Sequence, residues 1–458
     1  MRDDEIANCV TATQTIEQHI VEFIINGEES VTITNKTQFD VDITKPFTYV
    51  SLFSGIGGFE TALNRLGGKC VMASEIDKHA NKAYEILYGM PTTGDVTKIA
   101  VEDVPDHDLL TAGFPCQSFS IAGKRLGFED TRGTLFFEIA RIAKEKRPKV
   151  LLLENVKGLI GHNKGNTIET IVRVLNDIGY TVDFQVLNSK YFGVPQNRER
   201  VFFVCVRDDL IDREPWRIEG TNVVAKAKKR LSQIDGIKTF NFDWPEQTEV
   251  TTRLRDILED NVDEKYYLSE EKTAKLVAQL ESHQEIDSDG LQMLGKIEGI
   301  NGHEQRKKVY SVNGVSPTPS GLGIGGNTEP KIAEEQIYSW EDEFRIRREE
   351  QEVRPVLTPD RIEKRQNGRR FKDSDEPAFT LTAQDRHGVA MGKKPRYRIR
   401  KLTPLECFRL QGFPDEYYFK LKQAGISNSQ LYKMAGNAVT VNVVQVVTKT
   451  IKEQFLCI

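Results

Sequence analysis

The stretch FTYVSLFSGIGGFETALNRLG, residues 47 to 67, decides the fold. An almost unbroken apolar run ends in the turn SGIGG, and the segment FETALNRLG that follows has the apolar spacing of a helix and a terminal glycine. Glycines between a strand and a helix let the backbone approach a ligand closely. The stretch therefore predicts a buried strand, a ligand-binding turn and a helix.

The same alternation continues to about residue 207. Further strands are predicted in CVMASEID, DLLTAGFP, KVLLLENV, TVDFQVLN and RVFFVCV, and a helix in GTLFFEIARIAKEK. Strands that are apolar almost throughout and alternate with amphipathic helices indicate an α/β fold with a doubly wound, mostly parallel sheet. Such sheets bind ligands at the carboxyl ends of their strands. The segments expected at these ends are SGIGG, Glu75, Asp95, GFPCQ and ENV.

Two acids complement the glycine turn. Glu75 ends the second predicted strand, where an acid typically accepts hydrogen bonds from ribose hydroxyls. Asp95, in GDV, is expected after a third strand, in a position to meet an adenine amino group. Together these residues predict a site for a nucleoside-containing cofactor.

The motif GFPCQSFS, residues 113 to 120, places Cys116 directly after a proline in a turn. A thiol has an ordinary pKa of about 8.5, so it needs a positive or dipolar setting to ionise near neutrality. A thiolate can add to an electron-poor carbon of a conjugated ring, especially when an acid hydrogen-bonds to the ring nitrogen. Glu154, at the end of the predicted strand KVLLLENV, is the candidate acid.

Two arginines in QNRER precede another buried strand. Arg198 and Arg200 alternate with Glu199, so both can face the same side of an extended chain. Two guanidiniums there could hold a base carbonyl oxygen and a carboxylate.

Composition narrows the class of protein. A chain of 458 residues with 38% hydrophobic and 29% charged residues is typical of a soluble globular protein with two or three domains. It has no apolar run of membrane-spanning length, and its first residues do not resemble a secretory signal. We therefore expect a cytoplasmic protein. The six cysteines form no CxxC pair, so neither a metal site nor a disulfide framework is expected.

Charge is unevenly distributed along the chain. The net charge is -5, yet residues 361 to 401 contain 13 Lys and Arg against 5 Asp and Glu, a local excess of 8. A basic segment in an acidic chain suits contact with phosphates.

Six motifs, in order, resemble those of the C5-cytosine-specific DNA methyltransferase family of bacteria and phages. They are FSGIGGF, GFPCQSFS, ENVKGL, QNRERVFFV, RKLTPLECFRLQGFP and GNAVTVNVV. The resemblance spans about residues 47–207 and 398–445. It implies the class I fold of methyltransferases that use S-adenosyl-L-methionine, and the methylation of C5 of a flipped-out cytosine in duplex DNA. It also implies that the protein associates with the nucleoid.

The resemblance also implies roles for individual residues. Cys116 would attack C6 of the cytosine, Glu154 would contact N3 and the exocyclic amine, and Arg200 would hold O2. Arg198 would help to position the base and the thiolate. The cofactor contacts carried over are Phe53, Gly55, Gly57, Glu75, Asp95, Pro115, Asn437 and Val439.

The expected DNA contacts lie in two places. The segment after the cysteine resembles the mobile catalytic loop of the family, and the recognition region contains a matching Thr-Leu pair and the segment QDRHG. The residues carried over as DNA contacts are Gln117, Ser120, Lys124, Arg132, Thr380 and Arg386. A restriction endonuclease that acts on the same site is a candidate partner of such an enzyme.

The motifs divide the chain into four parts. Residues 1–46 form an N-terminal extension of unknown role, and 47–207 the catalytic and cofactor-binding domain. Residues 208–398, which are polar and rich in turns, form a second, smaller and irregular target-recognition domain. Residues 399–458 contain the closing motifs and a helix, beginning near Met434, that packs back on the catalytic domain.

Three other interpretations remain open. An RNA cytosine-5 methyltransferase would use the same motifs, although the long variable domain favours DNA. A non-enzymatic DNA-binding regulator of the same fold would not need Cys116, Glu154 and Arg200 together. A nucleotide-dependent thiol oxidoreductase would explain the sheet, the glycine turn and the cysteine, but not ENV, QNRER and GNAVTV.

Overall fold

The structure, a computed structural model, describes part of the chain. The described residues are 22–24, 30–32, 45–115, 135–212, 214–252, 254–267, 269, 285–286, 292–296, 308–310, 353–357, 371–382, 387–391 and 398–457. The chain divides into two compact units, residues 1–42 and residues 43–458. In the first unit, β1 (Glu22–Ile24) pairs antiparallel with β2 (Ser30–Thr32).

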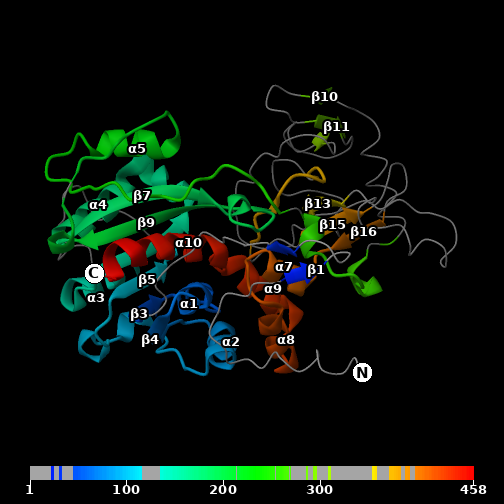
Figure 1. Ribbon diagram of the computed structural model, residues 1–458, viewed down its shortest axis with the longest axis horizontal. Helices are drawn as coiled ribbons and strands as arrows, with labels where there is room; N and C mark the ends of the chain where they lie inside the picture. The colour runs from blue at the N-terminus through cyan, green and yellow to red at the C-terminus, as the bar shows by residue number, and fades with distance from the viewer. Residues whose placement is uncertain are drawn as a thin grey trace. The chain divides into compact units, whose positions relative to one another are not determined.

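A six-stranded sheet is the centre of the second unit (Figure 1). Its order is β4 (Gly68–Ser74), β3 (Phe47–Leu52), β5 (Leu109–Gly113), β6 (Val150–Val156), β9 (Glu199–Arg207) and β7 (Tyr180–Asn188). The first four strands are mutually parallel, which confirms the predicted mostly parallel sheet. β9 is antiparallel to both of its neighbours, because residues 189–198 are too few for the crossover that a parallel connection needs.

Helices cover both faces of this sheet. One face packs against α1 (Gly58–Asn64), α2 (Lys78–Tyr88) and α10 (Val441–Ile451). The other face packs against α3 (Leu135–Lys146), α4 (Asn166–Asp177) and α5 (Val223–Leu231). Alternate residues of a strand point to opposite faces, so Leu152 joins the first core and Leu153 the second. The doubly wound arrangement is therefore confirmed.

The remaining described elements are short. Two further antiparallel sheets have the orders β10 (Glu285–Ile286), β11 (Gln292–Lys296), β12 (Lys308–Tyr310) and β13 (Val353–Leu357), β15 (His387–Met391), β16 (Arg398–Lys401). β8 (Gln196–Asn197) pairs in parallel with β14 (Ala378–Phe379). The short helices are η1 (Val96–Lys98), η2 (Val101–Asp103), η3 (Lys157–Ile160), η4 (His162–Gly165), η5 (Ser189–Tyr191), η6 (Asp208–Leu210), η7 (Leu254–Ile257), η8 (Glu264–Tyr266), α7 (Pro404–Arg409), α8 (Asp415–Gln423), α9 (Asn428–Asn437) and the π-helix η12 (Lys452–Leu456).

The segment that follows β9 stays with the sheet. Trp216 and Leu231 belong to the core that α3 and α4 cover. Asp183 of β7 binds this segment through Lys228 Nζ at 2.6 Å and through Trp244 Nε1, which donates at 2.8 Å. Residues up to about 244 are thus joined to the six-stranded sheet by packing or hydrogen bonds, although the sequence predicts a domain boundary at 207.

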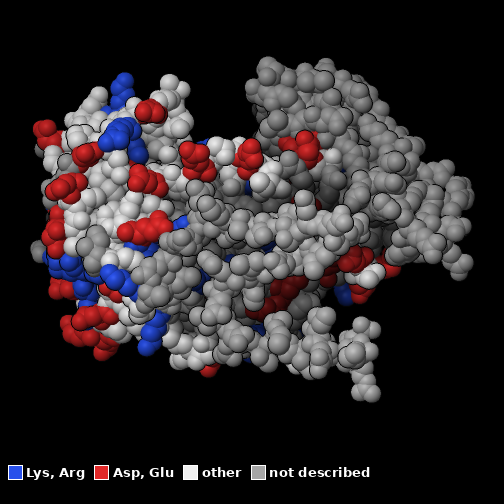
Figure 2. All heavy atoms as spheres, viewed as in Figure 1, with Lys and Arg blue, Asp and Glu red and all other residues white. Residues whose placement is uncertain are grey.

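Charged side chains of both signs are interspersed over the described surface that Figure 2 shows. Of the 13 Lys and Arg residues in the basic segment 361–401, nine lie outside the described residues. Among the helices that the structure describes, none is long and apolar enough to cross a membrane.

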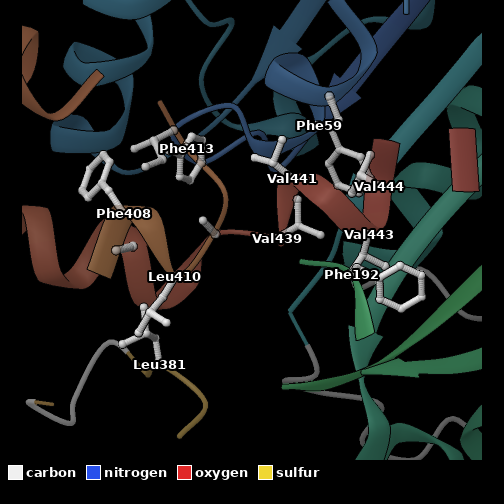
Figure 3. Packing of buried hydrophobic residues seen from close by; sticks show 14 of the residues in the cluster. Phe59, Phe192, Leu381, Phe408, Leu410, Phe413, Val439, Val441, Val443 and Val444 are labelled. Carbon is white, nitrogen blue, oxygen red and sulfur yellow. The ribbon is translucent and has the colours of Figure 1, made fainter. Parts of the chain in front are cut away.

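The closing segment packs back on the sheet, but not as the single helix expected from Met434. α9 ends at Asn437, Ala438 has an extended backbone with ψ 150°, and α10 starts at Val441. α10 then packs along α1, with Val444 beside the ring of Phe59 (Figure 3). The break places Val439 directly against Gly58, the first residue of α1.

Gly58, the first residue of α1, is tightly enclosed by this break. A Cβ added at Gly58 would lie 2.7 Å from Val439 Cγ1 and 2.8 Å from the Val439 carbonyl oxygen. A backbone oxygen cannot rotate away as a side chain can. The contact therefore requires glycine at this position.

We predict that Gly58→Ala lowers the free energy of unfolding by roughly 1–3 kcal/mol, because the new methyl group must displace backbone. Urea denaturation of the full chain measures this change. Gly161→Ala is the matched control, since Gly161 has φ -93° and open space around its Cβ position. Equal stability of the two variants would contradict the enclosure of Gly58.

Glu60 is a fully buried acid in the first turn of α1, two residues after Gly58. Its Oε1 accepts a hydrogen bond of 3.0 Å from the hydroxyl of Tyr84 on α2. Burial raises the pKa of this carboxyl to about 7, even though the hydrogen bonds it accepts act in the opposite direction. At pH values between 4.5 and about 7, the carboxyl therefore binds a proton when the chain folds.

A raised pKa makes the stability contribution of Glu60 largest at low pH. That contribution is complete below the ordinary value of 4.5 and is lost as the pH rises through about 7. We predict that the wild type loses about 2–3 kcal/mol relative to Glu60→Gln between pH 5 and pH 8. Urea denaturation at both pH values tests this. Exposed Glu145 provides the control variant Glu145→Gln, for which a similar pH-dependent difference would refute the assignment to Glu60.

Candidate active site

The turn after β3 has an unusual backbone. Phe53, Gly55 and Gly57 have φ values of 57°, 57° and 82°, all in the left-handed region. For a bulky residue such as Phe53 this conformation is rare and costs on the order of 1–3 kcal/mol. A Cβ at Gly57 would overlap the ring of Tyr88, whereas a Cβ at Gly55 would meet open space. The turn is therefore enclosed by Tyr88 at Gly57 and is open at Gly55.

Glu75 connects this turn to the end of β4. Its Oε2 accepts a hydrogen bond of 2.9 Å from the Gly55 amide, and its Oε1 accepts from the amides of Ile76 and Asp77, both at 2.8 Å. Each carboxylate oxygen has two lone pairs, so Oε2 retains capacity for one more donor. Glu75 can therefore fix the turn and still accept a bond from a ligand hydroxyl.

Asp95 reaches the same edge by a different route from the one predicted. It follows no strand; instead the loop before it returns to β4, where Thr93 N donates to Ala73 O at 2.8 Å and Ser74 Oγ donates to Gly94 O at 2.7 Å. The prediction of a strand before Asp95 is wrong, because the loop of residues 90–95 forms neither a strand nor a helix and is held by these bonds to β4. Hydrogen bonds from the Thr97 hydroxyl and amide lower the pKa of Asp95, which keeps it an anionic acceptor.

These residues fit a nucleoside. Glu75 offers an acceptor for hydroxyls and Asp95 an acceptor for an amino group. Directly after Glu75 in the sequence, Ile76 has an apolar side chain that is 69% exposed and suited to contact one face of a flat ring. The open space beside Gly55 lies at the carboxyl end of the sheet, where α/β folds bind ligands.

The closing segment meets this edge as well. Val439 is buried against Gly58, directly beside the glycine turn. Lys433 of α9 forms an ion pair of 2.6 Å with Asp77, the N-cap of α2, and so ties α9 to the residue two positions after Glu75. Asn437, at the end of α9, is exposed. Pro115, two residues after the end of β5, is also exposed.

The ends of β5 and β6 form the second half of the site. Gly113 pairs with Glu154 in the parallel register. Buried Asn155 donates from Nδ2 to the Phe114 carbonyl at 2.7 Å, which fastens the loop after β5 to the end of β6. The predicted nucleophile Cys116 lies just outside the described residues, as do the predicted DNA contacts Gln117, Ser120, Lys124, Arg132 and Arg386.

Glu154 and Arg200 are brought together as an ion pair. Arg200 Nε lies 3.0 Å from Glu154 Oε1, and the side chains are 17% and 12% exposed. Burial lowers the pKa of Arg200, while the charges of Glu154 and Glu199 act to raise it. Glu199 points elsewhere and pairs with Lys157 at 2.8 Å. A guanidinium and a carboxylate lie side by side here, largely shielded from water. Together they can bind a planar group that has a hydrogen-bond acceptor for the arginine and a hydrogen-bond donor for the glutamate.

Arg198 is buried nearby but has different partners. Its Nη1 donates to Leu381 O at 2.7 Å and to Gly436 O at 3.3 Å, and its Nη2 donates to Ala438 O at 2.8 Å. Burial and then the charge of Arg200 lower the pKa of Arg198, and Glu154 acts in the opposite direction. The hydroxyl of Thr380 donates to the Asn197 carbonyl, so this predicted DNA contact is engaged within the protein.

Three residues of the site were not singled out from the sequence. Asn155 holds the loop of the predicted nucleophile, Lys433 holds α9, and Gln196 donates to Leu410 O at 2.8 Å. Asn155 and Gln196 lie inside the quoted motifs ENVKGL and QNRERVFFV, so their membership of these motifs was the one feature of the sequence that could have identified them. Within the described part of the chain, no His, Cys, Asp and Glu side chains gather as they would around a metal ion.

Comparison with known proteins gives consistent results. A family model described as C-5 cytosine-specific DNA methylase matches residues 47–453. The chain is 49% identical over 440 residues to the orphan methyltransferase M.SPBetaI of Bacillus phage SPbeta, covering 86% of this chain and 95% of that protein. It is 32% identical over 403 residues to the type II methyltransferase M.HhaI of Haemophilus parahaemolyticus, covering 88% and 93%.

Two solved structures share the fold. Crystal structures of a Spodoptera frugiperda DNMT2 mutant and of the S. pombe Dnmt2 methyltransferase each align with a TM-score of 0.51, at 17% and 18% identity. The alignments cover 88% and 89% of this chain and 98% of each structure. At this identity the likeness bears on the fold, which agrees with the class I methyltransferase architecture predicted from the sequence.

Proposed function

The chain belongs to the C-5 cytosine-specific DNA methylase family and is a DNA (cytosine-5-)-methyltransferase, and from this premise we propose how it works. We propose that it transfers the methyl group of S-adenosyl-L-methionine to C5 of a cytosine flipped out of a specific duplex sequence, through a covalent adduct with Cys116. The observation that supports this most strongly is the Glu154–Arg200 ion pair at the carboxyl end of β6, beside Gly113.

The cofactor would be held at the edge formed by β3 and β4. Glu75 would accept from the ribose and Asp95 from the adenine amino group. Phe53, Gly55, Gly57 and Pro115 would line the site, with Asn437 and Val439 closing it from the C-terminal segment. When bound, S-adenosyl-L-methionine supplies a methyl group on a sulfonium sulfur, which the activated C5 of cytosine accepts.

Reach supports Cys116 as the nucleophile. Cys116 follows Gly113 by three residues, a span of at most about 11 Å between Cα atoms, and Gly113 pairs with Glu154. The Cys116 thiolate would add to C6, breaking the C5–C6 double bond and making C5 electron-rich. Glu154 would bind N3 and the exocyclic amine, and Arg200 would bind O2, so that the charge developing on the ring is stabilised. Loss of the C5 proton and elimination of the Cys116 sulfur would then restore the aromatic ring.

The substrate must present C6 to the thiolate. Stacking covers both faces of a paired cytosine, so the base must leave the duplex, at a cost of a few kcal/mol. We propose that residues of the loop after β5, among them Gln117, Ser120, Lys124 and Arg132, contact the DNA around the extruded base. Arg386 would contact DNA from the recognition region, where its segment QDRHG follows the Thr380–Leu381 pair.

The division of the chain follows from these roles. We propose that residues 1–46 are an extension, and that the target-recognition domain ends near 398, where the closing segment begins. Its start is better placed after about residue 244 than after 207, because Trp216, Leu231 and Trp244 pack with the sheet or bind β7.

The names of two relatives are relevant to whether a restriction endonuclease accompanies this enzyme. M.SPBetaI is named an orphan methyltransferase and M.HhaI a type II methyltransferase, and we propose a restriction endonuclease that acts on the same site as a candidate partner of this chain. Methylation mapping of an expression host would identify the recognition sequence. A host extract that cuts unmodified DNA at that sequence would identify an endonuclease partner.

We predict that Glu154→Gln lowers the rate of methyl transfer to duplex DNA about 10²- to 10³-fold, because an amide cannot balance the charge of Arg200 or support charge at N3. Glu199→Gln is the matched control, an adjacent ion-paired acid that contacts Lys157 instead. The assay is transfer of labelled methyl from S-adenosyl-L-methionine at saturating substrate. Equal rates for the two variants would remove Glu154 from the proposed mechanism.

We predict that Cys116→Ser abolishes transfer while cofactor binding stays nearly intact. A duplex with 5-fluorocytosine at the target site should trap a covalent adduct with the wild type, since fluorine cannot leave as a cation. Cys457→Ser, far along the sequence at the C-terminus, is the control that should retain both activities. Label incorporated into tRNA and not into DNA would instead support an RNA methyltransferase.

A further inference from the structure

Arg198 is the point at which three distant segments of the chain meet. Its guanidinium binds the carbonyl oxygens of Leu381, Gly436 and Ala438, at 2.7, 3.3 and 2.8 Å. Leu381 follows Thr380 in the recognition region, whereas Gly436 and Ala438 flank Asn437 in the closing segment. Hydrogen bonds from a charged donor to buried carbonyls are among the stronger ones in proteins.

The neighbours of Arg198 strengthen the same junction. The side chain of buried Gln196 accepts from Leu381 N at 2.9 Å and donates to Leu410 O at 2.8 Å. β8 pairs with β14 just before Thr380, whose hydroxyl bonds to the Asn197 carbonyl. Figure 3 shows Leu381 next to Leu410 on the apolar side of this junction. The recognition region is thus joined to the catalytic part by main-chain and side-chain bonds together.

Arg198 also lies beside the catalytic pair. It precedes Arg200 by two positions along one extended chain, and the charges of both Arg200 and Glu154 act on its pKa. Both terminal nitrogens of Arg198 are engaged by carbonyl oxygens, whereas Arg200 binds Glu154. The two arginines therefore have different partners although they are close together.

We propose that Arg198 is a positioning residue that couples target recognition and cofactor closure to the base pocket. It would hold the Thr380–Leu381 segment and the Gly436–Ala438 break at a fixed distance from Arg200 and Glu154, without contacting the base itself. Misplacement of either segment then moves the catalytic pair. The inference rests on the proposed function, in which Glu154 and Arg200 bind the cytosine.

The test compares three arginine variants after the methylated sequence has been mapped. Arg198→Lys keeps the charge but loses the forked geometry that reaches several carbonyls. Arg200→Lys changes the proposed base contact. Arg230→Lys is the matched control, because Arg230 also donates to backbone carbonyls, those of Lys164 and Gly165, at the junction of α5 and η4. Each variant is assayed for kcat, for KM toward S-adenosyl-L-methionine, and for the ratio of DNA Kd values between the mapped duplex and one with a single changed base pair.

The expected pattern separates the roles. Arg198→Lys should lower kcat about 100-fold, raise the cofactor KM about tenfold and reduce the discrimination between duplexes about tenfold. Arg200→Lys should lower kcat but preserve the cofactor KM and the discrimination. Arg230→Lys should leave all three quantities unchanged.

Two results would overturn the proposal. If Arg198→Lys loses kcat alone, as expected for Arg200→Lys, then Arg198 acts as a direct base contact. If it loses thermal stability with kcat, KM and discrimination intact, it is a structural brace. A wild type that methylates no DNA would instead refute the proposed function and leave no pattern to compare.

A second variant keeps the test decisive if Arg198→Lys does not fold. Gln196→Met removes both bonds of the Gln196 side chain while retaining its length and the apolar packing. It should reduce discrimination and raise the cofactor KM, with smaller changes than at Arg198, in protein shown by circular dichroism to be folded. Unchanged discrimination in this variant would refute the coupling role of the junction.

Discussion

The direction of one strand determines where the chemistry of this protein can occur. β9 runs antiparallel to β6, so Arg200, near the start of β9, lies opposite Val156 at the carboxyl end of β6. A parallel strand with the same sequence would place Arg200 at the opposite edge of the sheet, away from Glu154 and from the turn after β3. The ion pair at 3.0 Å therefore depends on the reversal, and the reversal depends on the short link of residues 189–198.

The same link explains why the closing segment belongs to the site. Residues that cannot form a crossover helix still carry polar groups, and these must find partners when buried. Gln196 and Arg198 find them on Leu381, Leu410 and the break between α9 and α10. Because that break also presses Val439 against Gly58, the two halves of the site share one support.

Much of this architecture could be predicted from the sequence, for a physical reason. Strands buried on both faces are apolar almost throughout, and they stand out against polar loops and amphipathic helices. The acids at strand ends, Glu75 and Glu154, stood out because a charge directly after an apolar run is unusual. The direction of β9 could not be predicted in this way, since a buried strand has the same pattern in either direction.

Other features had no local pattern to reveal them. The helix expected from Met434 is interrupted because of contacts with Gly58 and Arg198, which are distant in sequence and invisible to periodicity. The strand that the sequence predicts before Asp95 is not formed, but the loop before Asp95 still brings this residue to β4. The partners of Arg198 are backbone carbonyls, and every residue type supplies one. Side-chain chemistry can suggest that an arginine matters without indicating what it binds.

The position of α10 has a consequence for biosynthesis. Phe59 and the apolar face of α1 are synthesised early, but Val441 and Val444, which cover them, lie about 380 residues further along the chain. Until then this apolar face of the nascent polypeptide lacks its cover, and exposed hydrophobic surface of this kind makes folding intermediates prone to aggregation. The face of the sheet that α1 covers therefore reaches its final packing only after the segment that contains α10 has been synthesised.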